Sequence, residues 1–221
     1  MTSAELAELI SDCPQIYHMA ERGAWDGIKR HGLMSTCALL DLFKIDGQSK
    51  IQISKMHRPA IVEISDEDAG LARIRDQIPM SDAGLRRALP ADITPADWYL
   101  RLNKMVFFWM SKERLLRLTN AKAYRTSEHE VLVLDTRKFI DAFFEKIWLC
   151  AINSGCTKPF PHPRDFEAFK RIPDYDYALW RRRRPRGERV VELCVDNVVP
   201  DVERFLLDGF VIRGEERLRA L

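Results

Sequence analysis

The chain has 221 residues, 46% of them hydrophobic, so it can bury one full core but is short for two enzyme-sized domains. Its 35 lysines and arginines nearly balance 33 aspartates and glutamates, which excludes a polyanion partner recognised by overall charge alone. We therefore expect one domain spanning 1–221, in which any contact with nucleic acid depends on a local basic patch.

The cysteines and the N-terminus narrow the class of protein further. Five cysteines are widely scattered, with no CxxC pair and no cysteine–histidine spacing typical of a metal site, so we expect neither a disulfide framework nor a bound metal. The first residues, MTSAELAELISDC, are acidic where a signal peptide is basic, and no apolar run approaches the ~20 residues of a membrane span. These features predict a soluble cytoplasmic protein with reduced thiols and no membrane partner.

In chain order, helical signals dominate the N-terminal half. Thr2 and Glu5 form a capping box for a first helix that ends before Pro14, and Gly32 stops the second helix. Serines and a Thr-Pro pair open later helices, and a short one follows Ser111. Together with the short helix after Ser111, the expected helices cover residues 2–12, 24–30, 36–43, 49–56, 82–89, 96–103 and 136–144.

Strand patterns alternate with these helices. They cover residues 15–20, 59–64, 105–110, 129–135, 146–150 and 189–195, with a last strand near the C-terminus. The segment from Asn153 to Gly187 is expected to be mostly irregular because five prolines interrupt it, although its aromatic residues indicate that it packs against the rest. The fold class predicted is α+β, with mainly antiparallel strands and with helices in the N-terminal half and in the connections.

Two titratable residues lie on strands that are otherwise apolar. In RVVELCV, period-two alternation places Glu192 on one face with Val190 and Cys194. A lone buried carboxylate costs several kcal/mol, so Glu192 needs a partner or a function; the alternative is an edge strand on which it faces water or an arginine. His18 lies between apolar residues of the first strand, where a hydrogen-bonded core histidine is the alternative to a functional one.

Three stretches are informative when taken together. IYHMAERGAWDGIKRHGLMS (16–35) has a histidine on a strand that leads into a short helix ending in Gly-Leu. KMVFFWMSKERLLRL (104–118) is an aromatic strand that runs into a helix whose first turn carries serine, and in ERVVELCVDNVVPDV (188–202) a glutamate enters an apolar strand. In this order they resemble the three motifs of the ADP-ribosyltransferase superfamily, and most of all those of DarT-like DNA ADP-ribosyltransferase toxins.

The resemblance has two departures. The second motif has Phe-Phe-Trp where many relatives have a tyrosine, and the segment from Asn153 to Trp180 matches no part of that superfamily. The stretches IYHM, ALLDLF and SGCTKPFPHPR are also similar to bacterial proteins of unassigned function.

The resemblance implies a fold with split antiparallel sheets and a reaction on NAD, whose nicotinamide–ribose bond breaks through an oxocarbenium-like transition state. Glu192 would be the catalytic carboxylate that stabilises the developing positive charge. His18 would orient a ribose, Arg75 would reach the pyrophosphate, and Phe107 or Phe108 would stack on nicotinamide. The residues expected to bind NAD are Tyr17, His18, Ser35, Arg75, Phe107 and Phe108.

The acceptor of ADP-ribose is expected to be DNA or RNA, because the basic run Arg181–Arg189 directly precedes Glu192. Its residues would contact phosphates and stack on unpaired bases, and they are Tyr177, Trp180, Arg181, Arg182, Arg183, Arg184 and Arg186. The alternative is a solvated surface loop paired with Glu188 and the carboxylates of DYDY. A toxin or defence role, with an antitoxin or a reversing hydrolase as partner, follows from the same resemblance.

Other functions stay open at this point. The same chemistry on a protein or small molecule, or plain NAD hydrolysis, is one alternative, and a non-catalytic nucleic-acid-binding module is another. Cys156 lies near His162 in a loop-like stretch, but a nucleophile and its base are normally brought together by the fold. The sequence lacks the GxSxG, GxxxxGK[ST] and GxGxxG motifs of serine hydrolases, P-loop proteins and dinucleotide folds.

Overall fold

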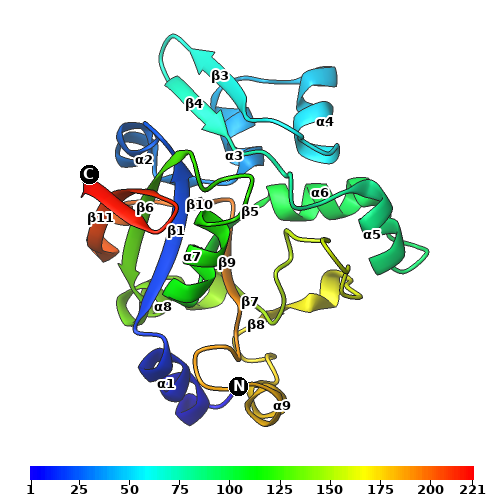
Figure 1. Cartoon of the computed structure of the whole chain (residues 1–221), viewed down its shortest axis with the longest axis vertical. Coiled ribbons are helices and arrows are strands. Elements are labelled where there is room, and N and C mark those ends of the chain that lie inside the picture. Colours follow the sequence, from blue (N-terminus) through cyan, green and yellow to red (C-terminus); the bar gives the residue numbers. More distant parts are fainter.

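One large antiparallel sheet forms the centre of the fold in the computed structural model, which describes residues 1–221 (Figure 1). Its strand order is β12-β11-β6-β1-β5-β9-β7-β8. The strands are β1 (Gln15–Glu21), β5 (Met105–Trp109), β6 (Glu128–Asp135), β7 (Ile147–Cys150), β8 (Phe169–Arg171), β9 (Glu192–Asp196), β11 (Leu206–Arg213) and β12 (Glu216–Ala220). Small sheets pair β2 (Leu33–Met34) with β10 (Val198–Val199) and β3 (Val62–Asp66) with β4 (Gly70–Ile74). The predicted α+β class with antiparallel strands is confirmed.

Short helices surround this sheet, and most begin within a residue of the predicted start; α4 begins two residues earlier than expected, and α9 lies in the segment expected to be irregular. They are α1 (Ser3–Asp12), α2 (Trp25–His31), α3 (Thr36–Leu42), α4 (Gly47–Lys55), α5 (Asp82–Ala88), α6 (Pro95–Asn103), α7 (Lys112–Thr119), α8 (Thr136–Phe143) and α9 (Tyr177–Arg183). The capping box of Thr2 and Glu5 is present on α1, and Ser111 accepts a hydrogen bond from the backbone of α7. No helix combines the length and the apolar character needed to cross a lipid bilayer.

Gly32 ends α2 as predicted, and its conformation requires glycine. Its φ is +82°, a region that side chains other than glycine rarely adopt. A Cβ atom at this position would lie 2.8 Å from the carbonyl oxygen of Val199, because β10 passes directly over the turn. The turn therefore directs the chain into β2 and brings the following Ser35 beneath β10.

Both faces of the sheet are covered by helices. On one face Phe108 packs against Phe139 of α8, with ring centroids 4.9 Å apart, in the largest hydrophobic cluster. On the other face Leu115 of α7 belongs to a cluster with Val131 of β6, and Trp98 of α6 packs in another cluster. Among the central strands, β5 (MVFFW) has no charged side chain and β9 (ELCVD) has only Glu192 and Asp196, so the buried Glu192 needs a specific environment.

The sheet is split between β1 and β5. These two strands share the single aligned pair Tyr17 and Trp109, whereas β1 and β6 align over seven residue pairs. Beyond that pair the two halves of the sheet separate, and β3, β4, α3 and α4 lie past this end of the sheet (Figure 1). An opening between strands exposes backbone and side chains that a continuous sheet would cover.

The segment from Asn153 to Gly187 is more regular than predicted. It contains β8, a 3₁₀ turn at Phe166–Ala168 and α9, and the first three arginines of the basic run belong to this last helix. The prolines lie between these elements, so they delimit structure without preventing it. The strand expected at 189–195 is β9, which begins three residues later than predicted, at Glu192.

Candidate active site

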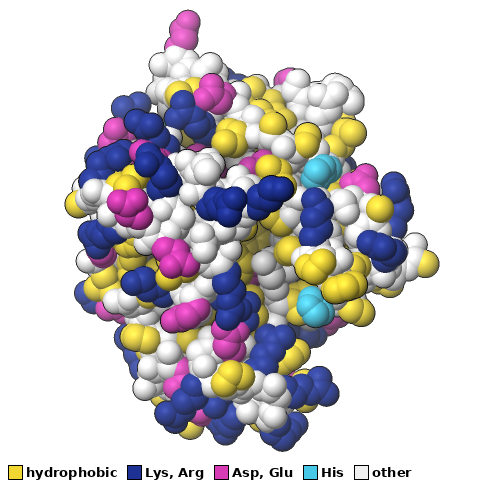
Figure 2. Space-filling view, viewed as in Figure 1, with side chains coloured by type: hydrophobic (Ala, Val, Ile, Leu, Met, Phe, Trp, Pro, Cys, Tyr) yellow, Lys and Arg dark blue, Asp and Glu magenta, His cyan; other side chains and the backbone are white.

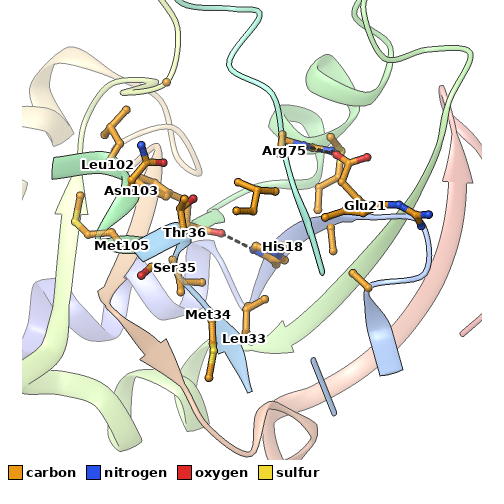
Figure 3. Close-up of a pocket in the computed structure, with 18 of the residues that line it drawn as sticks. His18, Glu21, Leu33, Met34, Ser35, Thr36, Arg75, Leu102, Asn103 and Met105 are labelled. Atoms are coloured by element: carbon orange, nitrogen blue, oxygen red, sulfur yellow. Dashed lines mark hydrogen bonds and ion pairs between the residues drawn. The ribbon is translucent and has the colours of Figure 1, made fainter. Parts of the chain in front are cut away.

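A cavity of about 510 Å³ opens at the split between β1 and β5. Its walls come from β1, β2, β4, β5, β9, α2, α3 and α7, together with the loop after β7. Figure 3 shows the part of the wall that carries His18, Ser35 and Arg75. Figure 2 shows a hollow near the centre of this face of the molecule. Six of the seven residues predicted to act on or bind NAD line this cavity: His18, Ser35, Arg75, Phe107, Phe108 and Glu192.

Tyr17 is the exception, and its expected role in binding NAD is not supported. Neighbouring side chains of a strand point to opposite faces, so Tyr17 turns away when His18 turns toward the cavity. The Tyr17 ring is buried in the hydrophobic cluster that contains Leu115 of α7, and its hydroxyl donates a hydrogen bond to Gln15.

Glu192 lies inside the sheet, because β9 is flanked by β5 and β7. It aligns with Trp109 on one side and Cys150 on the other, so the alternative of an edge strand facing water is wrong. Its side chain is 4% exposed. Burial raises the pKa of the carboxyl to about 7, which means that the group changes charge near neutral pH.

The loop after β7 provides the hydrogen bonds of the Glu192 carboxylate. The backbone N–H of Ser154 lies 3.2 Å from both carboxylate oxygens. Buried Arg164 holds this loop, donating to the carbonyl oxygens of Ser154 at 2.9 Å and Cys156 at 2.8 Å. Ser154 and Arg164 were not among the site residues predicted from the sequence, since nothing in the local pattern relates them to a glutamate far along the chain.

His18 is neutral and oriented by the backbone of β5. Its Nδ1 lies 2.8 Å from the carbonyl oxygen of Phe107, and since a carbonyl only accepts, Nδ1 carries the proton and donates it. Burial lowers the pKa of the ring to about 4, so the imidazole stays uncharged at neutral pH. Nε2 has no protein partner and is therefore an acceptor left for a hydroxyl group of a ligand.

Arg75 is held in a polar network on one side of the cavity, where Figure 3 shows it beside Glu21. Its Nε donates to Glu21 Oε1 at 2.8 Å, and its Nη2 lies 3.1 Å from His129 Nδ1. The guanidinium lies over the ring of Tyr124. Two of its three nitrogens are thus already used, which leaves Nη1 for the pyrophosphate contact expected from the sequence. Glu21, His129 and Tyr124 were not singled out by sequence analysis.

Ser35, Phe107 and Phe108 differ in how far each is free to contact a ligand in the cavity. The Ser35 hydroxyl accepts the Ala38 N–H of α3 at 3.2 Å, so its oxygen caps the helix and only its hydrogen is free to donate to a ligand. Phe108 is 1% exposed between His18 and Phe139 and belongs to the core. Phe107 is only partly buried and remains the candidate to stack on a ring.

The residues expected to bind the acceptor do not lie at this cavity. None of them lines it, and Figure 2 shows basic side chains gathered over α9, away from the central hollow. Tyr177 is 1% exposed and its hydroxyl accepts from Arg189 at 3.0 Å, so stacking of Tyr177 on a base is excluded. Trp180 is half-buried beside Arg183 and Arg184. The expectation that this segment forms the mouth of the active site is wrong.

Several of these arginines are paired with acidic residues of α1. Arg181 forms an ion pair with Glu8, and Arg186 lies 3.7 Å from Asp12. Arg184 donates to the carbonyl oxygen of Ala151. Arg182 and Arg183 remain exposed without a carboxylate partner. Glu188, which was expected to pair with these arginines, instead forms an ion pair with Arg114 of α7. The structure contains no group of three or more His, Cys, Asp or Glu side chains that could hold a metal ion.

The cysteine alternative gains no support from the structure. The thiol of Cys156 donates to the carbonyl oxygen of Lys158 at 3.2 Å and forms no hydrogen bond with His162. A nucleophile needs its base within hydrogen-bond reach, so this pair is not a catalytic dyad.

Fold and site together define an α+β protein with a cavity whose lining includes both a buried carboxylate, Glu192, and a neutral histidine, His18. Residues 14–206 match a family of unknown function, DUF7002, and the chain belongs to this family. The match begins just before β1 and ends after β9, and so includes every cavity residue named above. No curated protein that was compared with the chain matches it.

Proposed function

We propose that the protein is an NAD-dependent ADP-ribosyltransferase that transfers ADP-ribose to nucleic acid and releases nicotinamide. The observation that supports this most is the convergence of Glu192, His18, Ser35, Arg75 and Phe107 on one cavity, although they come from segments far apart in the chain. The cavity volume of about 510 Å³ suits a small-molecule ligand, since ligand pockets measure ~300–1,000 Å³.

The reaction would use the ionised form of Glu192. The bond between ribose C1′ and the nicotinamide nitrogen breaks, its electron pair leaves with neutral nicotinamide, and positive charge develops on the ribose. A carboxylate held by the Ser154 N–H in a buried setting stabilises this charge more strongly than it would in water. The acceptor atom then bonds to C1′ and releases its proton to solvent.

The neighbouring groups would bind and orient the dinucleotide. Nε2 of neutral His18 accepts a hydrogen bond from a ribose hydroxyl, and the apolar face of Phe107 packs against nicotinamide. Nη1 of Arg75 donates to a phosphate oxygen. None of these groups needs to transfer a proton, so their effect is to position the substrate.

Nucleic acid is the proposed acceptor because Arg182 and Arg183 are exposed on α9 without carboxylate partners. Transfer to a protein or small molecule, or hydrolysis of NAD, is the second candidate, favoured by the fact that α9 does not line the cavity. The proposal places the protein in the cytoplasm, where its five cysteines remain free thiols, with an antitoxin or a reversing hydrolase as partner.

The test is nicotinamide release from NAD by the wild type and by Glu192→Gln, with and without single-stranded DNA or RNA. We expect turnover by the wild type, its loss in the variant, and stimulation by nucleic acid that declines with added salt. No turnover by the wild type with any acceptor would refute the enzyme, and nucleic-acid binding that survives in Glu192→Gln would then favour a non-catalytic binding module.

The acceptor is tested separately with Arg182→Gln/Arg183→Gln. The double variant should keep NAD hydrolysis and lose labelling of nucleic acid, because its cavity is unchanged. Arg87→Gln is a matched control, since this arginine is also exposed on a short helix, α5. Equal labelling by the double variant and the wild type would favour the second candidate.

A further inference from the structure

The Glu192 carboxylate depends on one neighbouring residue for its hydrogen bonds. Both of its oxygens lie 3.2 Å from the Ser154 N–H, and no other group of the protein donates to them. One N–H divided between two oxygens is a weak anchor for a charge in a buried site, where a carboxylate normally accepts several hydrogen bonds.

The Ser154 hydroxyl beside this carboxylate has no committed partner. Ser154 is 1% exposed and lines the cavity with Glu192, yet its Oγ makes no hydrogen bond of good geometry. A buried hydroxyl without a partner costs free energy, so its presence calls for an explanation. The Ser154 side chain is close enough to Glu192 to lower the pKa of the carboxyl, opposing the larger effect of burial.

Arg164 holds Ser154 in this place from behind. Its Nη1 donates to the Ser154 carbonyl oxygen at 2.9 Å, and that oxygen also accepts from the Trp98 indole at 3.3 Å. Nε donates to the carbonyl of His162 at 3.0 Å, and the Arg164 N–H donates to Ala88 of α5 at 2.9 Å. Arg164 is 4% exposed; its backbone N–H joins the loop to α5, and its guanidinium lies by the Trp98 ring of α6, so the loop is held on both sides.

We propose that Ser154 is a positioning residue for Glu192: its hydroxyl donates to the ionised carboxylate and fixes the oxygen that faces the ribose, while Arg164 fixes Ser154. This inference rests on the proposed function of the cavity. With the hydroxyl turned to the carboxylate, one oxygen is bound by the side chain and the other by the backbone N–H. The carboxylate is then oriented before the substrate binds.

The charged and titratable groups that act on Glu192 come from several elements. Arg114 of α7 and Arg164 of the loop favour its ionised form. The thiols of Cys150 on β7 and Cys194 on β9 are buried beside it, and burial raises the pKa of each far enough to keep both thiols neutral. Substitution of Ser154 leaves these four groups in place, whereas Arg164→Lys changes one of them deliberately.

The experiment compares Ser154→Ala, which keeps the backbone N–H, with Ser154→Thr, which restores a hydroxyl. For each variant kcat and KM for NAD are measured from pH 5.5 to 8.5, and the Glu192 carboxyl is titrated by carbon-13 NMR. Ser54→Ala is the matched control, because Ser54 is also buried but does not line the cavity. Ser154→Cys, which has nearly the same shape and a weaker donor, replaces Ser154→Ala if that variant does not fold.

We expect Ser154→Ala to lower kcat about 5- to 20-fold with KM within about twofold, because the lost contact acts on the transition state. The acidic limb of the pH profile and the carboxyl titration should both move up by about 0.5 to 1 pH unit, since a donor to the charged form is removed. Ser154→Thr should restore both, Arg164→Lys should show the same changes as Ser154→Ala, and Ser54→Ala should show neither.

Wild-type kcat and an unmoved titration in folded Ser154→Ala would overturn the inference and leave the hydroxyl as a space-filling group. If the wild type itself does not turn over NAD, the proposed function fails. The carbon-13 titration then decides alone, and an identical titration of Glu192 in the wild type and Ser154→Ala refutes the positioning role.

Discussion

Glu192→Gln should make the protein more stable at neutral and alkaline pH. Glu192 is 4% exposed, and its pKa is raised from 4.5 to about 7 by burial. Each unit of pKa corresponds to about 1.4 kcal/mol, so the ionised carboxylate costs the folded state about 3 kcal/mol. Glutamine removes the charge and keeps an oxygen that accepts the Ser154 N–H, but its buried amide hydrogens cost about 1 to 2 kcal/mol where they lack acceptors. We expect a net gain of about 1 to 2 kcal/mol.

The stability difference between Glu192→Gln and the wild type should depend on pH, because it comes from ionisation of the carboxyl. Below pH 4.5 the carboxyl is protonated in both the folded and the unfolded chain, so wild type and variant should have similar stability. Between pH 4.5 and about 7 the unfolded chain releases the proton and the folded chain retains it, so wild-type stability falls as the pH rises. Above pH 7 the difference between wild type and variant should be constant.

Urea unfolding at a series of pH values from 4 to 8.5 measures this difference directly. Glu167→Gln is the control, because Glu167 is exposed beside Lys170, which lowers the pKa of its carboxyl, and its substitution should not stabilise the protein. A variant that is no more stable relative to wild type at pH 8 than at pH 4.5 would refute the burial cost assigned to Glu192. If Glu192→Gln is more stable than the wild type but inactive, the loss of activity is not caused by unfolding.

Three further outcomes are expected. If Glu192 acts as a carboxylate, kcat for nicotinamide release should rise with pH along one limb near pH 7, and a rate that stays flat from pH 5.5 to 8.5 would contradict this. Gly32→Ala should destabilise the protein by about 2 kcal/mol or more in thermal or urea unfolding, because φ is +82° and the added Cβ would lie 2.8 Å from the Val199 carbonyl. Tyr177→Phe should cost about 1–3 kcal/mol, because the charged Arg189 loses an acceptor, and nicotinamide release should be unchanged if Tyr177 is purely structural.

The predicted position of the basic run Arg181–Arg189 is wrong, and the reason is informative. A sequence of arginines directly before Glu192 was expected to lie at its cavity, but the chain turns through α9 and packs there on α1. Arg189 forms an ion pair with Glu8, a residue 181 positions away, and Tyr177 is buried in the same region. Nearness in sequence gave no information about this contact because its partner lies at the other end of the chain.

Features of this fold that depend only on neighbouring residues can be predicted from the sequence. Alternation placed Glu192 and Cys194 on one face of a strand, and the register with β5 and β7 agrees. Capping residues located the starts of α1 and α7, and Gly32 marked the end of α2, because these signals act within one turn of backbone. The α+β class followed from the sum of such local patterns.

Which strands are neighbours, and how deeply each side chain is buried, depends on the tertiary structure. Tertiary packing places β9 inside the sheet, raises the pKa of Glu192, separates β1 from β5 beside His18 and brings Ser154 to the carboxylate. Each of these results depends on contacts between segments far apart in the chain, such as the 38 residues that separate Ser154 from Glu192. Such contacts form only when the whole core packs, because the free energy of burying one segment depends on every segment that covers it.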